Sequence, residues 1–244
     1  MIGAAAGLGA VALLKRQAAV ARAVIGKPHG ETAPDADRTY KKKQGNRVEL
    51  LIVGDSIAAG LGAETPEGTL GARLAKRLAK DAKRAVRLRT IAEVGAESPM
   101  LPGQLATLPD DYRPTVAVIL VGGNDVIHRV PVAESVRHLV ETIGALRERG
   151  AYVVVGTCPD LGALKAVPQP LRSLISRWSR RLADAQAEAA HAAGADVVRM
   201  AALVGPFFVA QPDEMFSIDQ FHPSAAGYKR TAKALLPAVR RGLL

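Results

Sequence analysis

Five short apolar runs recur along the chain, and segments with a helical spacing of apolar residues lie between them. The runs cover residues 48–53, 86–92, 116–121, 152–155 and 195–200. Nearly continuous apolar runs are typical of parallel strands that are buried on both faces. Run 86–92 alternates more than the others, so we place it at an edge. We therefore predict an α/β protein, with helices on both faces of an open, five-stranded parallel sheet.

Outside these strands, apolar residues three and four positions apart predict amphipathic helices. The main stripes are Leu70, Leu74 and Leu78; Val136, Leu139, Val140, Ile143 and Leu146; Leu171, Leu174, Ile175, Trp178 and Leu182; and Tyr228, Leu235, Leu236 and Val239. Glycines at 150 and 194 mark the ends of the second and third helices, and Pro223 precedes the last one.

The chain divides by composition into three parts. Residues 1–25 form an apolar and basic N-terminal helix, residues 26–46 a polar linker or extended arm, and residues 47–244 the α/β domain. The uncharged stretch 2–14 would make a helix of about 20 Å, which is shorter than a bilayer core of about 30 Å. It fits a weak membrane anchor, a signal remnant or a helix packed on the domain or a partner. Localisation thus stays open between cytoplasmic and membrane-associated, and an exported form would follow if the true start lay upstream.

The net charge of +10 favours anionic partners, but much of the excess lies before the first long apolar run. Aromatic residues make up 4% of the chain, too few to indicate a base-stacking surface, so nucleic acid is not an expected partner. The single cysteine, Cys158, excludes an intrachain disulfide and a cysteine-based metal cluster. Nothing in the sequence indicates an oligomeric state.

The first buried run leads into a glycine-rich segment that carries Ser56. A serine just past a buried strand can stand at the mouth of the sheet, where neighbouring N–H groups suit an oxyanion. Taken alone, the serine is more simply explained as a helix N-cap. The segment matches neither a phosphate-binding loop nor a dinucleotide fingerprint, and Ala58 replaces the second glycine of the G-x-S-x-G elbow.

Three further polar clusters follow later strands or the last loop. Asn124, after the third run, offers a side-chain N–H donor, and Gly95, after the second, could offer its backbone N–H. The spacing of Asp219 and His222 lets a turn bring the carboxylate to one ring nitrogen and leaves the other nitrogen to take a proton from a serine. Each cluster alone is more simply a turn or a helix cap, but all of them fall where an open sheet can bring them to one crevice.

In this order the blocks resemble the SGNH/GDSL hydrolase family. The resemblance covers about residues 47–240 and is carried by Gly54-Asp55-Ser56, Gly95, Gly122-x-Asn124-Asp125 and Asp219-x-x-His222-Pro223. It implies a flavodoxin-like three-layer α/β/α fold and a serine esterase or lipase with Ser56, His222 and Asp219 as a catalytic triad. It also implies an oxyanion hole built from the N–H groups of Ser56 and Gly95 and the Asn124 side chain, with no metal or cofactor. Ile57, where the family often has leucine, and Glu97, near the second block, are small departures.

The substrate is expected to be a small-molecule or lipid ester, with lysophospholipids among the options. All four phenylalanines of the chain, Phe207, Phe208, Phe216 and Phe221, lie between the fifth strand and His222 and could form an apolar wall for an acyl chain, although local loop packing is the simpler explanation. We select Phe207, Phe208 and Phe221 as the candidate substrate contacts. An acyltransferase with the same triad and a non-catalytic lipid or carbohydrate binder remain alternatives. The missing phosphate motifs argue against a nucleotide-binding protein of similar fold.

Overall fold

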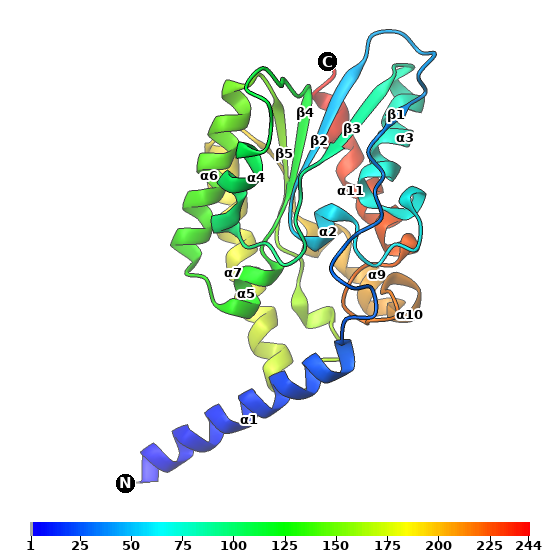
Figure 1. The fold of residues 1–244 in the computed structure, drawn as a ribbon. Helices are drawn as coiled ribbons and strands as arrows, with labels where there is room; N and C mark the ends of the chain where they lie inside the picture. The colour runs from blue at the N-terminus through cyan, green and yellow to red at the C-terminus, as the bar shows by residue number, and fades with distance from the viewer. Residues whose placement is uncertain (1) are drawn as a thin grey trace.

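The computed structural model describes residues 2–244, with side chains from residue 9 onwards, and its centre is a six-stranded sheet (Figure 1). The strands lie in the order β1-β3-β2-β4-β5-β6. All neighbouring strands run parallel except β1, which is antiparallel to β3. The strands are β1 (Thr39–Tyr40), β2 (Val48–Gly54), β3 (Val86–Thr90), β4 (Val116–Leu120), β5 (Tyr152–Gly156) and β6 (Asp196–Val198).

The sixth strand comes from the arm, so the prediction of five strands with residues 86–92 at an edge was wrong by one strand. The N–H of Leu88 donates to the carbonyl of Arg38 over 3.0 Å, and the N–H of Thr90 donates to the Asp37 carboxylate over 2.8 Å. Strand β1 has only two residues and lies in a polar segment, so it shows no strand-like alternation of apolar residues. It forms because β3 offers a partner for its backbone.

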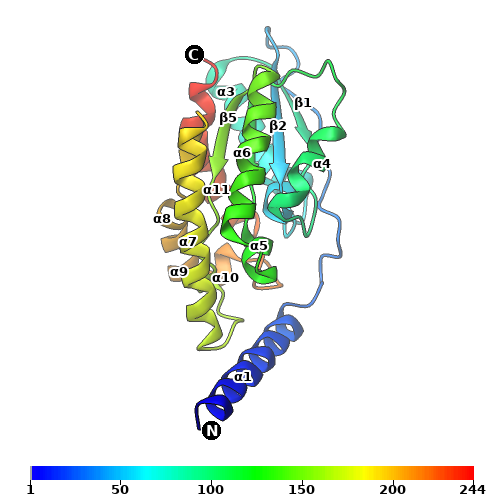
Figure 2. The same ribbon diagram turned by 90° about the vertical axis from the view of Figure 1, so that its left-hand side faces the viewer.

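Alternate residues of each strand point to opposite faces of the sheet, which gives one core on each face. One core joins Leu50, Ile52 and Val118 to helices α3 (Leu70–Ala82) and α11 (Ala225–Arg241). The other joins Leu51, Val53 and Ile119 to helices α4 (Leu101–Ala106) and α6 (Val132–Glu148), with α7 (Leu171–Ala192) packed beside α6. Figures 1 and 2 show the resulting layers, which confirm the predicted α/β/α architecture.

Short helices fill the end of the domain where the parallel strands terminate. They are α2 (Ser56–Ala59), α5 (Gly123–His128), α8 (Met200–Leu203), α9 (Gly205–Ala210) and α10 (Pro212–Met215), with 3₁₀ turns η1 (Pro66–Gly68), η2 (Ser98–Met100) and η3 (Leu161–Ala163). Helix α11 begins here as well, because the Ser224 hydroxyl accepts hydrogen bonds from the N–H groups of Ala226 and Gly227, both over 3.1 Å.

Helix α1 (Ile2–Ile25) projects from this same end of the domain (Figures 1 and 2). The C-terminal half of α1 contacts the domain at Gln17. This side chain is buried, and its oxygen accepts the Leu171 N–H over 3.0 Å. Val20 and Val24 remain exposed on the helix surface. Across residues 2–244, none of the helices combines the length and the apolarity that crossing a bilayer requires. The arm after α1 then runs along the domain to the edge of the sheet.

Candidate active site

The polar clusters meet at the carboxyl ends of β2 and β4. Strand β2 lies between β3 and β4, so the chain leaves β2 in one direction and later crosses to its other side. The crevice at such a reversal is the usual ligand site of an open α/β sheet. Ser56 follows β2 and Asn124 follows β4, which places both residues at this crevice.

A tight turn after β2 presents Ser56. Gly54 has φ +135°, and a Cβ atom there would lie 1.8 Å from the Leu120 carbonyl oxygen, so the turn requires glycine. The Asp55 carboxylate accepts the Ile57 N–H over 2.9 Å and caps α2. Burial raises the pKa of Asp55 to about 6, and this effect outweighs the hydrogen bond from Ile57.

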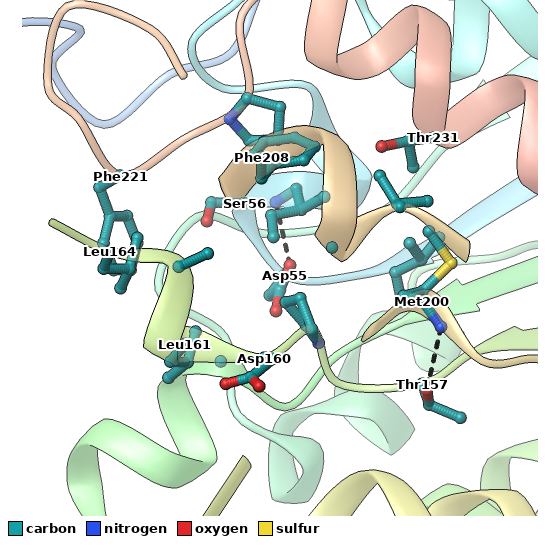
Figure 3. A pocket seen from close by; sticks show the side chains of 18 of the residues that line it. Asp55, Ser56, Thr157, Asp160, Leu161, Leu164, Met200, Phe208, Phe221 and Thr231 are labelled. Atoms are coloured by element: carbon teal, nitrogen blue, oxygen red, sulfur yellow. Dashed lines mark hydrogen bonds between the residues drawn. The ribbon is translucent and has the colours of Figure 1, made fainter. Parts of the chain in front are cut away.

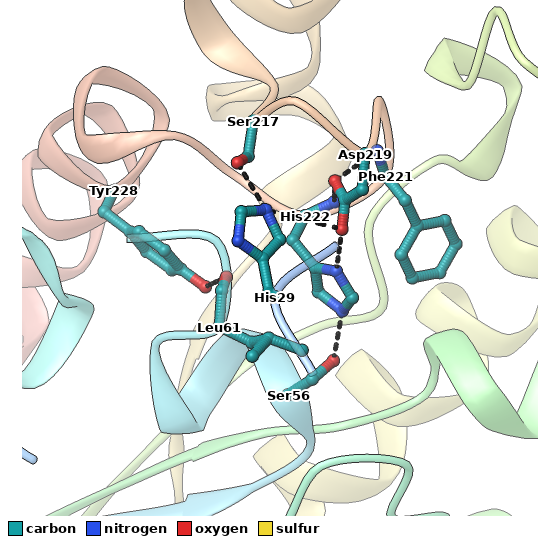
Figure 4. A network of polar contacts seen from close by, with 8 residues as sticks. All are labelled: His29, Ser56, Leu61, Ser217, Asp219, Phe221, His222 and Tyr228. Atoms are coloured by element: carbon teal, nitrogen blue, oxygen red, sulfur yellow. Dashed lines mark hydrogen bonds and ion pairs between the residues drawn. The ribbon is translucent and has the colours of Figure 1, made fainter. Parts of the chain in front are cut away.

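Ser56, His222 and Asp219 form one hydrogen-bonded series (Figure 4). The His222 Nε2 atom lies 2.9 Å from the Ser56 hydroxyl oxygen, and His222 Nδ1 lies 2.6 Å from the Asp219 Oδ2 atom. All three side chains are largely buried. In this arrangement the histidine can take the serine proton while the carboxylate holds the other ring nitrogen.

The Asp219 carboxylate is held in its charged form. Burial alone would raise its pKa, but hydrogen bonds from the His222 ring and from the N–H groups of Phe221 and His222 bring the pKa below its usual value. The two backbone bonds end on Oδ1, which leaves Oδ2 to face the imidazole. A charged carboxylate in this position can stabilise positive charge on the neighbouring imidazole ring.

Backbone contact also fixes the position of His222. Gly62, in the loop after α2, has φ +95°, and a Cβ atom on it would lie 2.8 Å from His222 Cβ and 2.6 Å from the Pro223 carbonyl oxygen. The loop therefore packs directly against the backbone that carries the histidine, and a larger residue would displace one or the other.

Ser56, Gly95 and Asn124 each carry an N–H donor at this end of the sheet, although Gly95 is exposed and is not among the residues that line the pocket beside Ser56. The backbone N–H groups of Ser56 and Gly95 make no hydrogen bond within the described residues, 2–244. Asn124 lines the same pocket as Ser56, and its amide donates one hydrogen to the Ala96 carbonyl over 3.0 Å, which leaves the second for a ligand. The loop of Gly95 is tied back to β2, because the Glu93 N–H donates to the Gly54 carbonyl over 3.0 Å.

A buried carboxylate fixes the Gly95 loop against α5. Asp125 accepts the Ser98 N–H at 3.2 and 3.1 Å on its two oxygens, and the Ser135 hydroxyl also donates to it. The residue is almost fully buried. Because Asn124 and Asp125 are adjacent, one turn of helix holds both the side-chain donor and the loop that carries the backbone donor.

An apolar pocket opens beside Ser56 (Figure 3). Together with its open mouth it holds about 880 Å³ of empty space. Apart from Ser56 and Asn124 its wall is mainly aliphatic and aromatic, with Ile57, Leu120, Leu161, Leu164, Met200, Val204, Phe208, Phe216 and Phe221 among the lining residues. A pocket of this character suits a hydrocarbon chain.

The three phenylalanines singled out in the sequence do not share one position. Phe208 and Phe221 line the pocket, and Phe208 packs edge-to-face on Phe216, with ring centroids 4.8 Å apart. Phe207 departs from the expectation, because its ring lies under the Arg230 guanidinium, 4.3 Å away, and is not among the lining residues. Neighbouring residues of the short helix α9 point in different directions, so only one of this pair faces the pocket.

Sequence reasoning missed two buried glutamines that hold the strand ends. Gln104 accepts the Gly54 N–H over 3.0 Å and donates to the Gly54 carbonyl over 2.8 Å. Gln186 donates to the Val121 carbonyl over 3.0 Å and accepts the Cys158 N–H over 2.7 Å. For Gln186 the available signal was a polar residue on the apolar face of the helix predicted from Leu171, whereas Gln104 lies where no helix was predicted. These bonds satisfy backbone groups where β2 and β4 leave the sheet.

Comparison with known proteins agrees with this geometry. The model of the GDSL-like Lipase/Acylhydrolase family matches residues 52–230. The GDSL-like esterase Rv1075c of Mycobacterium tuberculosis is 41% identical over 97% of this chain and 78% of its own length. Esterase TesA of Pseudomonas aeruginosa is 30% identical over 78% of this chain and 87% of its own. A lipase/acylhydrolase structure from Enterococcus faecalis superposes with a TM-score of 0.62 at 21% identity, covering 80% of this chain and 96% of that one.

These findings define the class of protein. The chain belongs to the GDSL-like lipase/acylhydrolase family, as the resemblance of its motifs implied. It is a carboxylic ester hydrolase of the esterase or lipase type.

Proposed function

We propose that this hydrolase cleaves acyl esters by nucleophilic catalysis at Ser56, with His222 as general base and Asp219 as its partner. The hydrogen-bonded series from Ser56 to Asp219, opening on an apolar pocket, carries the proposal. His222 removes the hydroxyl proton as the serine oxygen attacks the ester carbonyl. The protonated imidazole then gives its proton to the leaving alcohol, and water releases the acid from the acyl-enzyme.

The negative charge that develops on the carbonyl oxygen would be held by N–H donors. The unpaired backbone N–H groups of Ser56 and Gly95 and the second amide hydrogen of Asn124 are suited to this role. Donors that are already oriented in a buried site stabilise such a charge more effectively than water does. The ties from Asp125 to the Gly95 loop support this orientation.

The acyl group would occupy the apolar pocket, and the preferred substrates would be esters with a hydrocarbon chain, including lipid esters. Phe208 and Leu164 form part of the wall along which such a chain would lie. Burying each methylene group of the chain is worth about 0.8 kcal/mol, so each added carbon improves binding until the pocket is full. The rate should therefore rise with acyl length and then level off or fall.

The test is a series of p-nitrophenyl esters, from acetate to long-chain acyl groups, on the wild type and on Ser56→Ala. We expect the variant to lose activity by about 10⁴-fold or more while it remains folded. A folded wild type that turns over none of the esters would support a binding role instead. Acyl groups appearing on an added alcohol, at the expense of free acid, would indicate an acyltransferase.

Two neighbouring phenylalanines give a matched test of the acyl pocket. Phe208→Ala enlarges the pocket, so the preferred chain length should move towards longer esters. Phe207→Ala removes a ring of the same size from outside the pocket, so the length profile should keep its wild-type shape. Equal shifts in both variants would contradict the assignment of the acyl site.

A further inference from the structure

A histidine from the N-terminal arm lies beside the proposed triad. Helix α1 ends at Ile25, and a turn follows in which the Gly30 N–H donates to the Lys27 carbonyl over 3.1 Å. His29, within this turn, points its ring into the domain, and its side chain is only 16% exposed. The arm thus brings a side chain to a loop that lies almost two hundred residues further along the sequence (Figure 4).

The ring of His29 makes one close polar contact and one longer one. Its Nε2 atom lies 2.7 Å from the Ser217 hydroxyl oxygen and 3.9 Å from the Asp219 Oδ2 atom. The first distance is a hydrogen bond, and the second places the ring edge against the carboxylate without bonding it directly. Figure 4 shows His29 and His222 on neighbouring sides of Asp219.

Ser217 closes the turn that carries the triad residues. Its N–H donates to the His222 carbonyl over 2.8 Å, and its own carbonyl accepts the Gln220 N–H over 2.9 Å. A bond from His29 to the Ser217 side chain therefore restrains the whole segment 217–222. Small displacements of such a segment are costly in catalysis, because the reacting groups must stay within a narrow range of distances.

His29 also covers the side of Asp219 that the turn leaves open. The Oδ1 atom is occupied by two backbone N–H groups, and Oδ2 bonds His222. The His29 ring lies 3.9 Å from Oδ2, and this carboxylate is almost wholly buried. Water reaching Oδ2 would compete with the imidazole for the same acceptor and weaken the hold on His222.

We infer that His29 is a positioning residue for the ester-cleaving site, acting through Ser217 and Asp219. The N-terminal arm is then a working part of the site, although it precedes the residues that the family model matches. This inference rests on the proposed triad, since His29 acts by holding Asp219 and His222 in place. It touches neither the substrate nor Ser56 in this role.

The experiment compares His29→Ala, His29→Gln and, as control, His191→Ala, in the full-length chain with a p-nitrophenyl ester. His191 is an exposed histidine on α7, so its replacement removes an imidazole away from the site. We expect His29→Ala to lower kcat by about 3- to 10-fold, the range that the loss of one hydrogen bond produces, with KM almost unchanged. His29→Gln should recover part of the loss, because its amide can reach the Ser217 hydroxyl.

The same substitution in an Asp219→Asn background separates positioning from general stabilisation. If His29 acts in part through Asp219, its loss should cost less in this background than in the wild type, since the carboxylate beside its ring is already gone. An unchanged kcat in His29→Ala, or an equal loss in both backgrounds, would overturn the inference. Should His29→Ala fail to fold, Ser217→Ala removes the same hydrogen bond from the other partner and must meet the same two criteria.

Ser56→Ala, assayed in parallel, keeps the two proposals distinguishable. Activity that survives this substitution would refute the triad itself. An inactive Ser56→Ala together with a fully active His29→Ala would leave the triad standing and refute only the role of the arm.

Discussion

Replacing Asp55 by asparagine tests what the buried carboxyl group beside the nucleophile costs the fold. The side chain is almost fully buried and caps α2 through the Ile57 N–H. Asparagine has a side-chain oxygen in the same place and can keep this cap, but it cannot ionise. The substitution therefore removes a titrating group and leaves the local hydrogen bond.

The size of the effect follows from the pKa of Asp55, which burial raises from 3.8 to about 6. Between these two values the unfolded chain has released its proton while the folded protein still holds it. The unfolded state therefore gains relative to the folded state as the pH rises through this window. Two pKa units correspond to about 3 kcal/mol of stability, which is lost progressively between about pH 3 and about pH 7.

Urea unfolding followed by circular dichroism, at about pH 4 and about pH 7, measures this term. Other groups titrate in the same range, but they cancel when the pH dependence of the variant is subtracted from that of the wild type. The wild type should lose about 2.5 kcal/mol more than Asp55→Asn between these two pH values. Asp213→Asn, on the exposed surface of α10, is the control for the loss of one charge. Equal pH dependence in Asp55→Asn and the wild type would refute the reasoning.

Three further substitutions test the supports of the site. Gly62→Ala should destabilise the fold by about 1–3 kcal/mol and lower kcat, because the added methyl group would lie 2.8 Å from His222 Cβ. Thermal unfolding measures the first effect and ester turnover the second. Gln104→Leu should cost about 1–3 kcal/mol in urea unfolding, because it leaves the buried Gly54 N–H without its partner. Asp219→Asn should lower kcat by about 10³- to 10⁴-fold in steady-state assays while the fold is kept, and a loss below about 10-fold would argue against its place in the triad.

The sequence predicted most of the layered architecture, because each central strand and each long helix carries its own apolar pattern. The predicted runs 48–53 and 116–121 match β2 (Val48–Gly54) and β4 (Val116–Leu120) to within one residue, and the stripe from Leu171 lies on α7. Strand β1 escaped prediction, since two residues in a polar arm show no period of their own. Its formation depends on a partner strand that lies more than forty residues away in the sequence.

The site, too, was predictable only where its residues stand in short sequence motifs, and not where residues far apart in the sequence contact one another. Ser56 and Asn124 stand in short motifs at strand ends and His222 stands in the last loop before α11, so their meeting could be expected from the topology and these motifs. The supports of these residues are long-range pairs: Gln104 bonds a residue 50 positions away, and His29 one 188 positions away. No spacing in the sequence encodes such pairs, and nothing in the polar arm distinguishes His29 as a residue that contacts the site.

Strand β1 has a further consequence, for how the protein behaves at high concentration. The edge of a sheet presents unpaired N–H and C=O groups and can recruit a strand from another molecule. The arm occupies this edge by taking the N–H groups of Leu88 and Thr90. Removing the arm would expose the β3 backbone, where the charges of Arg87 and Arg89 would be the remaining barrier to association. Shortened forms of the protein should therefore self-associate more readily, a defect separate from any loss of turnover that follows the loss of His29.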